Sequence, residues 1–220
     1  MTRKLISDRK GAPKGQAKSI VVFLHGYGAD GADLLGLSQP LAPHLPGTAF
    51  YAPNAPERCT GNPFGYQWFP IPWLDGSSEE AAKAGLDAAS ADLNAFLDQI
   101  LADEGLGAEA LALVGFSQGT MISLHVAPRR DMALAGIVGF SGRLLQPERL
   151  EADAVSRPPV LLVHGDADEV VPIQSLGEAA DALVQAGFEV YAHVSKGTAH
   201  GIAHDGLSLA LSFLRDKLPS

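Results

Sequence analysis

Short, almost wholly apolar segments alternate with longer amphipathic ones along this chain. The apolar segments are rich in Val, Ile and Phe, and they cover residues 19–26, 48–53, 111–117, 135–142, 159–165 and 188–194. We predict a β-strand at each, because runs of this length and composition are typical of strands that are buried on both faces. Residues 5–10 predict a further strand at an edge of the sheet.

Between the predicted strands, apolar residues recur at the spacing of amphipathic helices. The clearest stripe covers residues 86–101, and Ser77 with Glu80 predicts a capping box at the start of that helix. A second helix is predicted over residues 175–186 and is closed by Gly187. The C-terminal helix is marked by Leu207, Leu211, Leu214 and Leu218. This alternation predicts an α/β fold, with one domain over residues 1–220, a mostly parallel central sheet and helices on both faces.

Residues 53–76 interrupt the alternation. They contain five prolines and no clear period, and seven of the fifteen aromatic residues of the chain lie between Phe50 and Trp73. Long loops are usually functional or disordered, and a disordered loop would not concentrate aromatic side chains. We therefore expect an apolar wall of a substrate cleft, with Trp68, Phe69 and Trp73 as substrate-binding residues. A well-packed structural loop, or a homodimer contact around Trp73, is the alternative.

Composition and charge narrow the possible partners. The chain has 220 residues, of which 46% are hydrophobic and 19% charged, as is typical of a globular protein. Its formal net charge is −9 and its basic residues are not clustered, so binding to nucleic acid or to an anionic membrane is not expected. The N-terminus lacks the apolar run of a signal peptide, and no segment approaches the ~18–20 apolar residues of a membrane span. These features predict a cytoplasmic protein without membrane insertion.

The sequence predicts neither a metal nor an organic cofactor. Cys59 is the single cysteine, which excludes an internal disulfide and a cysteine-based metal site, and without an adjacent histidine it is interpreted as a bystander thiol. No His-Glu-x-x-His pattern occurs. Residues 11–19, GAPKGQAKS, precede a strand rather than join a strand to a helix, so they do not form a phosphate-binding loop.

The most informative stretch is LALVGFSQGTMISLH, residues 111–125, where a predicted strand leads into a predicted helix. A Gly-x-Ser-x-Gly match is weak by itself, and the strand before it and the helix after it give it meaning. A sharp strand-to-helix turn strains the backbone of the serine, and the flanking glycines relieve the crowding. We therefore predict that Ser117 is a nucleophile with its hydroxyl exposed at the carboxyl edge of the sheet.

A nucleophilic serine needs a base and a carboxylate, which in this architecture follow it in the order Ser, Asp or Glu, His. The loop after the next-to-last predicted strand carries Asp166 and Asp168. Asp166 follows the strand immediately and is also explained as a turn-stabilising residue, whereas Asp168 has more freedom to reach a neighbouring strand end. The loop after the last predicted strand carries His200, between His193 in the strand and His204 at the start of the final helix.

An oxyanion hole requires backbone N–H donors that face the reacting carbonyl, each worth ~3–4 kcal/mol of the barrier. Gln118, the residue after the nucleophile, supplies one such N–H group. The second is expected from the loop after the strand at 19–26, where HGYGADGAD places Tyr27 between two glycines. We therefore predict the backbone N–H groups of Tyr27 and Gln118 as the donors.

Four motifs together resemble one enzyme family. FLHGYGADGADL, GFSQGTM, HGDADEVVP and GTAHGI are similar, in this order, to the phospholipase/carboxylesterase family of α/β-hydrolases, which includes the acyl-protein thioesterases. The similarity runs from about residue 18 to the C-terminus. It implies an α/β-hydrolase fold without a large cap. It also implies a catalytic triad of Ser117, Asp168 and His200, and an oxyanion hole formed by the backbone of Tyr27 and Gln118.

Two departures from the family leave the substrate open. Thr120 stands where the family often has a further glycine, and GYQWFPIPW resembles the family's substrate loop only loosely. An aromatic loop disfavours a charged acyl group, so we predict a serine carboxylesterase that takes small-molecule or lipid-like esters with short to medium acyl chains. The alternatives are an acyl-protein thioesterase, a lysophospholipase and a catalytically silent binding protein of the same fold.

Overall fold

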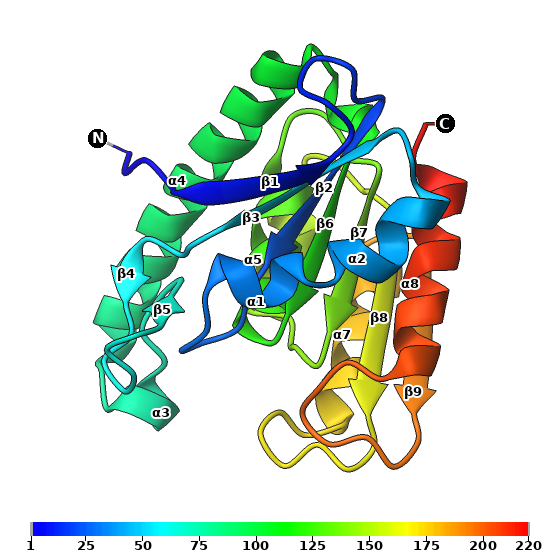
Figure 1. Cartoon of the computed structure of the whole chain (residues 1–220). Coiled ribbons are helices and arrows are strands. Elements are labelled where there is room, and N and C mark those ends of the chain that lie inside the picture. The colour runs from blue at the N-terminus through cyan, green and yellow to red at the C-terminus, as the bar shows by residue number, and fades with distance from the viewer. Residues whose placement is uncertain (1, 220) are drawn as a thin grey trace.

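The computed structural model describes residues 2–219, and within them a seven-stranded sheet has the strand order β1-β3-β2-β6-β7-β8-β9 (Figure 1). The strands are β1 (Ser7–Gly11), β2 (Ser19–Leu24), β3 (Thr48–Pro53), β6 (Leu111–Phe116), β7 (Gly136–Phe140), β8 (Val160–Gly165) and β9 (Val190–Ser195). β1 pairs antiparallel with β3 at one edge, and all other neighbours are parallel. The mostly parallel sheet is therefore confirmed, and the carboxyl ends of its parallel strands share one edge.

Helices connect the strands and cover the sheet (Figure 1). They are α1 (Gly31–Leu35), α2 (Ser38–Leu41), α3 (Pro72–Asp75), α4 (Glu79–Glu104), α5 (Gln118–Val126), α6 (Leu150–Asp153), α7 (Gln174–Gln185) and α8 (His204–Lys217). Short 3₁₀ turns occur at Ala42–His44, Ala108–Ala110, Ala127–Arg129 and Pro147–Arg149. Between residues 2 and 219, no helix combines the length and apolarity needed to span a bilayer.

Alternate residues of the strands build two hydrophobic cores, one on each face of the sheet. Ile20 and Val22 of β2 belong to the core that also contains the apolar residues of α4, α5 and α7. Val21 and Phe23 of the same strand belong to the core that contains those of α1, α2 and α8. Because successive side chains of a strand point to opposite faces, a strand that serves both cores must be apolar throughout.

The start of α4 differs by one residue from the predicted capping box. Ser78, not Ser77, is the N-cap, and its Oγ accepts a hydrogen bond from Ala81 N at 3.1 Å. The backbone N of Ser77 instead donates to Asp75 Oδ1 at 2.9 Å. The preceding short helix ends at Gly76 with φ 72°, and this turn selects the second of the two adjacent serines.

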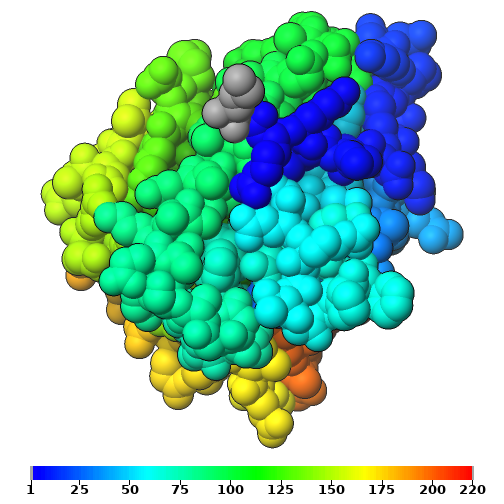
Figure 2. Space-filling model, turned by 90° about the vertical axis from the view of Figure 1, so that its left-hand side faces the viewer, coloured from blue at the N-terminus to red at the C-terminus, as the bar shows by residue number. Residues whose placement is uncertain are grey.

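Residues 53–76 are more regular than the sequence predicts. They contain a small hairpin of β4 (Glu57–Arg58) and β5 (Tyr66–Gln67), followed by α3. Tyr66 N donates to Ala29 O at 2.8 Å and Gly28 N donates to Tyr66 O at 2.9 Å, so the hairpin is attached to the loop that follows β2. Figure 2 shows this segment, in cyan and teal, as part of one continuous surface with α4 in green.

Candidate active site

Ser117 occupies the turn between β6 and α5. Its backbone angles are φ 53° and ψ −114°, a strained combination for a residue that has a side chain. Ser117 N donates to Phe140 O at 2.8 Å, which ties the turn to the neighbouring strand β7. A Cβ at Gly119 would lie 1.7 Å from Leu24 O, and one at Gly115 would lie 2.4 Å from the backbone of α5. Close packing of the helix on the sheet therefore requires the two glycines that flank the serine.

Asp168 and His200 meet at the same edge of the sheet, although they come from different loops. His200 Nδ1 lies 2.7 Å from Asp168 Oδ2, and Asp168 Oδ1 accepts hydrogen bonds from Val170 N and Val171 N at 2.9 Å each. The side chain of Asp168 is fully buried. Burial alone would raise the pKa of this carboxyl, but the hydrogen bonds from His200 and the two valine amides outweigh it and lower the pKa. The carboxylate is thus ionised near neutral pH and orients the imidazole.

Asp166, the alternative carboxylate, has a different set of contacts. Its Oδ1 accepts a hydrogen bond from Gly197 N at 2.6 Å. Next to it, Ala167 N donates to Thr198 O at 3.0 Å. Asp166 therefore joins the loop after β8 to the loop that carries His200, rather than stabilising only its own turn. Of the two aspartates, Asp168 is the one that contacts His200.

The other candidate histidines are held elsewhere. His193 lies on β9, where its Nε2 is 2.7 Å from Asp205 Oδ2, and His204 is the first residue of α8. The ring of His200 instead packs on that of Phe116, with ring centroids 4.9 Å apart. Since Phe116 immediately precedes Ser117, this contact attaches the loop of His200 to the end of the strand that leads to the candidate nucleophile.

The candidate nucleophile is more enclosed than the sequence predicts. Ser117 is only 8% exposed. Among the hydrogen bonds of residues 2–219, none joins its Oγ to His200. In unliganded active sites such contacts are often long, and they tighten when substrate is bound.

His164, which the sequence reasoning missed, supports the carboxylate. Its Nε2 lies 2.8 Å from Val171 O and 3.3 Å from Asp168 Oδ2, and its side chain is 2% exposed. Because a carbonyl oxygen only accepts, Nε2 carries the hydrogen and donates toward both oxygens. The sequence did carry a signal for this role, because His164 is a polar residue near the end of an otherwise apolar strand and lies four residues before Asp168.

The loop after β2 lies directly against Ser117. A Cβ at Gly26 would be 3.2 Å from Phe116 Cδ1 and 3.3 Å from Ser117 Cβ, so a larger residue would be crowded against the turn. Within the described chain, neither Tyr27 N nor Gln118 N donates a hydrogen bond to another residue. Both expected oxyanion donors are therefore without a protein acceptor, and both adjoin the nucleophile in sequence or in space.

His25 has a structural role in that loop. Its Nε2 accepts a hydrogen bond from Ala55 N at 2.9 Å, so the hydrogen of the ring is on Nδ1, which donates to Gly26 O at 2.8 Å. Burial lowers the pKa of His25, which keeps the ring neutral. The imidazole thus fixes the backbone next to Tyr27.

Trp68, one of the three residues expected to bind substrate, is completely enclosed. Its side chain is 0% exposed, and its indole Nε1 donates to His25 O at 3.0 Å. The N–H group of this buried indole is thus paired, as is usual for tryptophan in a protein interior. Trp68 lies behind the site and packs against it.

Phe69 and Trp73 line an apolar cavity of about 160 Å³. The cavity lies between the segment 69–73, the first turns of α4 and the loop after β7, which contributes Leu145. Trp73 is 64% exposed and stands under the guanidinium of Arg143, which lies 5.4 Å from the ring centroid. The cavity is therefore mainly apolar, and its polar lining residues are Glu79, Lys83 and Gln146.

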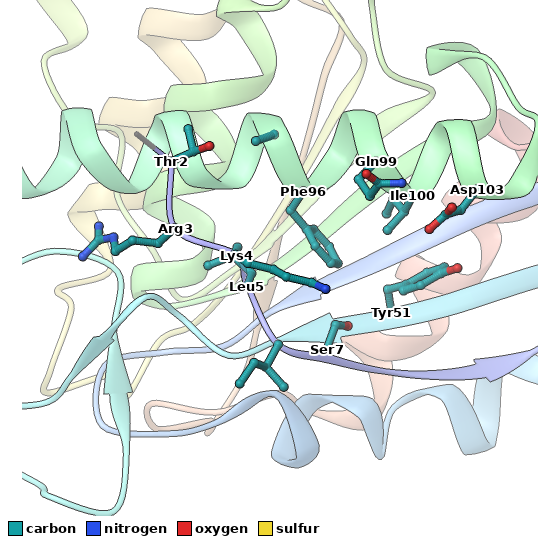
Figure 3. A pocket seen from close by; sticks show the side chains of 12 residues that line it. Thr2, Arg3, Lys4, Leu5, Ser7, Tyr51, Phe96, Gln99, Ile100 and Asp103 are labelled. Atoms are coloured by element: carbon teal, nitrogen blue, oxygen red, sulfur yellow. The ribbon is translucent and has the colours of Figure 1, made fainter.

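A larger cavity lies elsewhere on the described residues, so size alone does not mark the site. It is an open groove of about 800 Å³ between the N-terminal segment and α4. Figure 3 shows Phe96 and Asp103 of α4 and Tyr51 of β3 along it. None of its lining residues belongs to the loops that carry Ser117, Asp168 and His200.

Comparison with known sequences gives relatives along nearly the whole chain. The esterase YpfH of Escherichia coli (strain K12) is 27% identical over 94% of this chain and 87% of its own length. Acyl-protein thioesterase 1 of Saccharomyces cerevisiae is 31% identical over 93% of this chain and 95% of its own length.

Solved structures with the same fold agree with these relatives. The crystal structure of esterase PE8 matches with a TM-score of 0.92 and 47% identity, and the match covers 98% of this chain and all of the other. A phospholipase/carboxylesterase from Dyadobacter fermentans matches with a TM-score of 0.78 and 28% identity, over 96% and 97% of the two chains. The sequence model of the phospholipase/carboxylesterase family matches residues 11–218. The chain belongs to this family, and its fold is that of the α/β-hydrolases.

Proposed function

We propose that the protein is a serine hydrolase that cleaves carboxylic esters through an acyl-enzyme, with Ser117, Asp168 and His200 as the catalytic triad. The observation that carries the proposal is the 2.7 Å contact between the buried Asp168 carboxylate and His200, whose ring packs beside the strained Ser117 turn. A serine that follows a β-strand and precedes a helix, with this pair beside it, is suited to nucleophilic attack on a carbonyl. The esterases and thioesterases among its relatives support the same reaction class.

In the proposed reaction, His200 Nε2 takes the proton of Ser117 as Oγ bonds to the ester carbonyl carbon. The carbonyl oxygen becomes an oxyanion that accepts hydrogen bonds from the backbone N–H groups of Tyr27 and Gln118. Collapse of this intermediate breaks the bond to the alcohol oxygen, which receives the proton from His200. Water then repeats the sequence on the acyl-enzyme, releases the acid and restores Ser117.

The cavity lined by Phe69 and Trp73 suits an apolar acyl chain. Most of its lining is aromatic or aliphatic, with Glu79, Lys83 and Gln146 as the polar members, so an apolar chain finds more favourable contacts there than a charged one. We therefore propose short to medium acyl esters as substrates. In a series of p-nitrophenyl esters, kcat/KM should rise with chain length and then fall; higher rates for charged acyl groups would contradict this.

The assignment of the nucleophile is tested with Ser117→Ala. This variant should lose at least about 10³-fold of the ester hydrolysis rate, because the remaining groups cannot form an acyl-enzyme. A fluorophosphonate should label the wild-type protein on Ser117 and leave the variant unlabelled. Circular dichroism and the melting temperature check that the variant is folded. Near-normal turnover in the folded variant, or an unlabelled wild-type protein, would contradict the proposal, and the second result would favour a binding protein.

A second candidate is thioester hydrolysis, which the 31% identical acyl-protein thioesterase of yeast favours. The same triad can act on an oxygen ester and on a thioester, so the preference between the two depends on the leaving group, an alcohol or a thiol. Paired oxygen ester and thioester substrates with the same acyl chain would distinguish them through the ratio of kcat/KM.

A further inference from the structure

We propose that the side chain of Gln118 determines which acyl chains the enzyme accepts, although it does not line the cavity. The proposed role is that of a positioning residue: the amide fixes the wall of the acyl cavity to the nucleophile turn. This inference rests on the proposed function and deepens it, and it concerns the side chain of Gln118 rather than the backbone N–H group assigned to the oxyanion hole.

The amide of Gln118 is fully buried and has both of its polar ends paired. Its Oε1 accepts a hydrogen bond from Trp68 N at 2.9 Å, and its Nε2 donates to Phe69 O at 2.7 Å. The residue is 0% exposed. A side-chain amide that faces a backbone N–H and C=O in this way replaces the partner that a neighbouring strand would provide. The segment is thus held at two adjacent residues by one group.

The segment that the Gln118 amide binds, residues 68–69, is followed directly by residues that line the cavity. Phe69 is the residue whose carbonyl is bound, and its side chain lines the cavity together with Pro70 and Ile71. On the other side, α4 already packs closely, since a Cβ at Gly85 would lie 2.5 Å from Pro70 Cδ. The two hydrogen bonds of the Gln118 amide therefore hold Phe69, which forms part of the cavity wall, at a fixed position relative to the nucleophile turn.

Two further hydrogen bonds attach the same segment to the loop after β2. The indole of Trp68 donates to His25 O at 3.0 Å, and Gly28 N donates to Tyr66 O at 2.9 Å. These contacts keep the segment attached when Gln118 is changed. Loss of the amide should therefore shift the wall locally at Phe69 rather than release the segment, so the effect should depend on the acyl chain.

The test is Gln118→Met, which preserves the length of the side chain and removes both hydrogen bonds. Rates are measured with p-nitrophenyl acetate and p-nitrophenyl hexanoate, per active site counted by fluorophosphonate labelling. We expect kcat/KM for the hexanoate to fall about tenfold further than for the acetate, because only the longer chain depends on contact along the wall. Gln118→Glu, which keeps an acceptor for Trp68 N but cannot donate to Phe69 O when ionised, should shift the ratio in the same direction.

Gln67→Met is the matched control. Gln67 is also a buried glutamine, one residue before Trp68, but its amide contacts Thr60 N at 3.3 Å and Glu57 at 3.4 Å in the hairpin. This variant should keep the wild-type ratio of the two esters.

Two results would overturn the inference: an unchanged ratio of the two esters in the Gln118 variants, with or without a parallel loss on both, or an equal change of the ratio in Gln67→Met. If Gln118→Met does not fold, the Gln118→Glu variant decides by the same ratio. Failure of the proposed function is seen separately, because the wild-type protein would then neither hydrolyse the esters nor react with the fluorophosphonate.

Discussion

Ser117 has a backbone conformation that residues with side chains seldom adopt, and its surroundings maintain that conformation. A residue in such a region costs on the order of 1–3 kcal/mol, which the turn offsets through the hydrogen bond to Phe140 O and the start of α5. Asp168 is similar in that its burial is unfavourable for a carboxylate, and donors from His200 and the valine amides offset it. At the residue scale, the strained backbone of Ser117 and the buried carboxylate of Asp168 are both unfavourable in free energy, and contacts with neighbouring residues compensate for each of them.

His125 gives a pH-dependent prediction at this scale. It is 8% exposed on α5, and burial, with the nearby charge of Arg129, lowers its pKa from 6.5 to about 4. Between these values the unfolded chain binds a proton that the folded protein does not, so the stability due to this group falls as pH falls from about 6.5 toward 4. The loss should approach about 3 kcal/mol. Urea unfolding of wild type and His125→Leu at pH 7.5 and 4.5 measures it: stability should decrease less in the variant, and equal decreases would contradict the prediction.

At the scale of elements, the side chain of Thr120 lies between α5 and β7 and contacts both. Its hydroxyl lies 2.9 Å from both Gly115 O and Phe140 O, and its methyl group fills the space above Gly139. A Cβ at Gly139 would lie 2.5 Å from Thr120 Cγ2, and one at Gly142 would lie 2.4 Å from Thr120 Cβ. The departure from the family's glycine at position 120 is thus matched by glycines on the facing strand and loop.

This packing predicts that Gly139→Ala destabilises the protein by about 1–3 kcal/mol, since the added methyl overlaps that of Thr120. Thr120→Ser removes the opposing methyl group and keeps the hydroxyl that contacts Gly115 O and Phe140 O. In the double variant, most of the loss caused by Gly139→Ala should therefore disappear. The measurement is a double-mutant cycle: the free energy of unfolding in urea is determined for the wild type, both single variants and the double variant. Strictly additive losses would show that the two positions do not oppose each other.

At the scale of the whole molecule, one sheet serves two cores and assembles the site from distant parts of the chain. Asp168 and His200 are 32 positions apart, and Gln118 and Trp68 are 50 positions apart. Every central strand contributes to both cores. One domain over residues 1–220 stays a prediction, and it can be tested by unfolding.

A single domain predicts a single cooperative unfolding transition. Trp68 and Trp73 both lie in the aromatic segment, so tryptophan fluorescence reports on that segment, while far-ultraviolet circular dichroism reports on the whole fold. The two signals should give the same urea midpoint. Trp73→Phe, which leaves the buried Trp68 as the single indole, should give the same agreement. An earlier fluorescence transition would mean that the segment unfolds independently of the sheet.

Much of the fold and of the candidate site was predictable because the signals are local. Apolar runs and helical stripes report the periodicity of strands and helices, and the Gly-x-Ser-x-Gly turn carries its own steric requirement. The order of serine, aspartate and histidine follows from the order of parallel strands, whose carboxyl ends share one edge. The prediction was off by one residue at the cap of α4, because Ser77 matches the capping-box pattern with Glu80, whereas the turn at Gly76 makes Ser78 the N-cap.

By itself, the sequence determined the class of fold, the family and a short list of site residues. Tertiary structure distinguished between residues that look alike along the chain. Asp168 rather than Asp166 contacts His200, and His164 lies against the Asp168 carboxylate. Trp68 is buried, whereas Phe69 lines the cavity. Tertiary structure also revealed the pairing of the Gln118 amide. The physical reason is that hydrogen-bond partners and burial depend on distances between segments that are remote in sequence, which local propensity and periodicity do not encode.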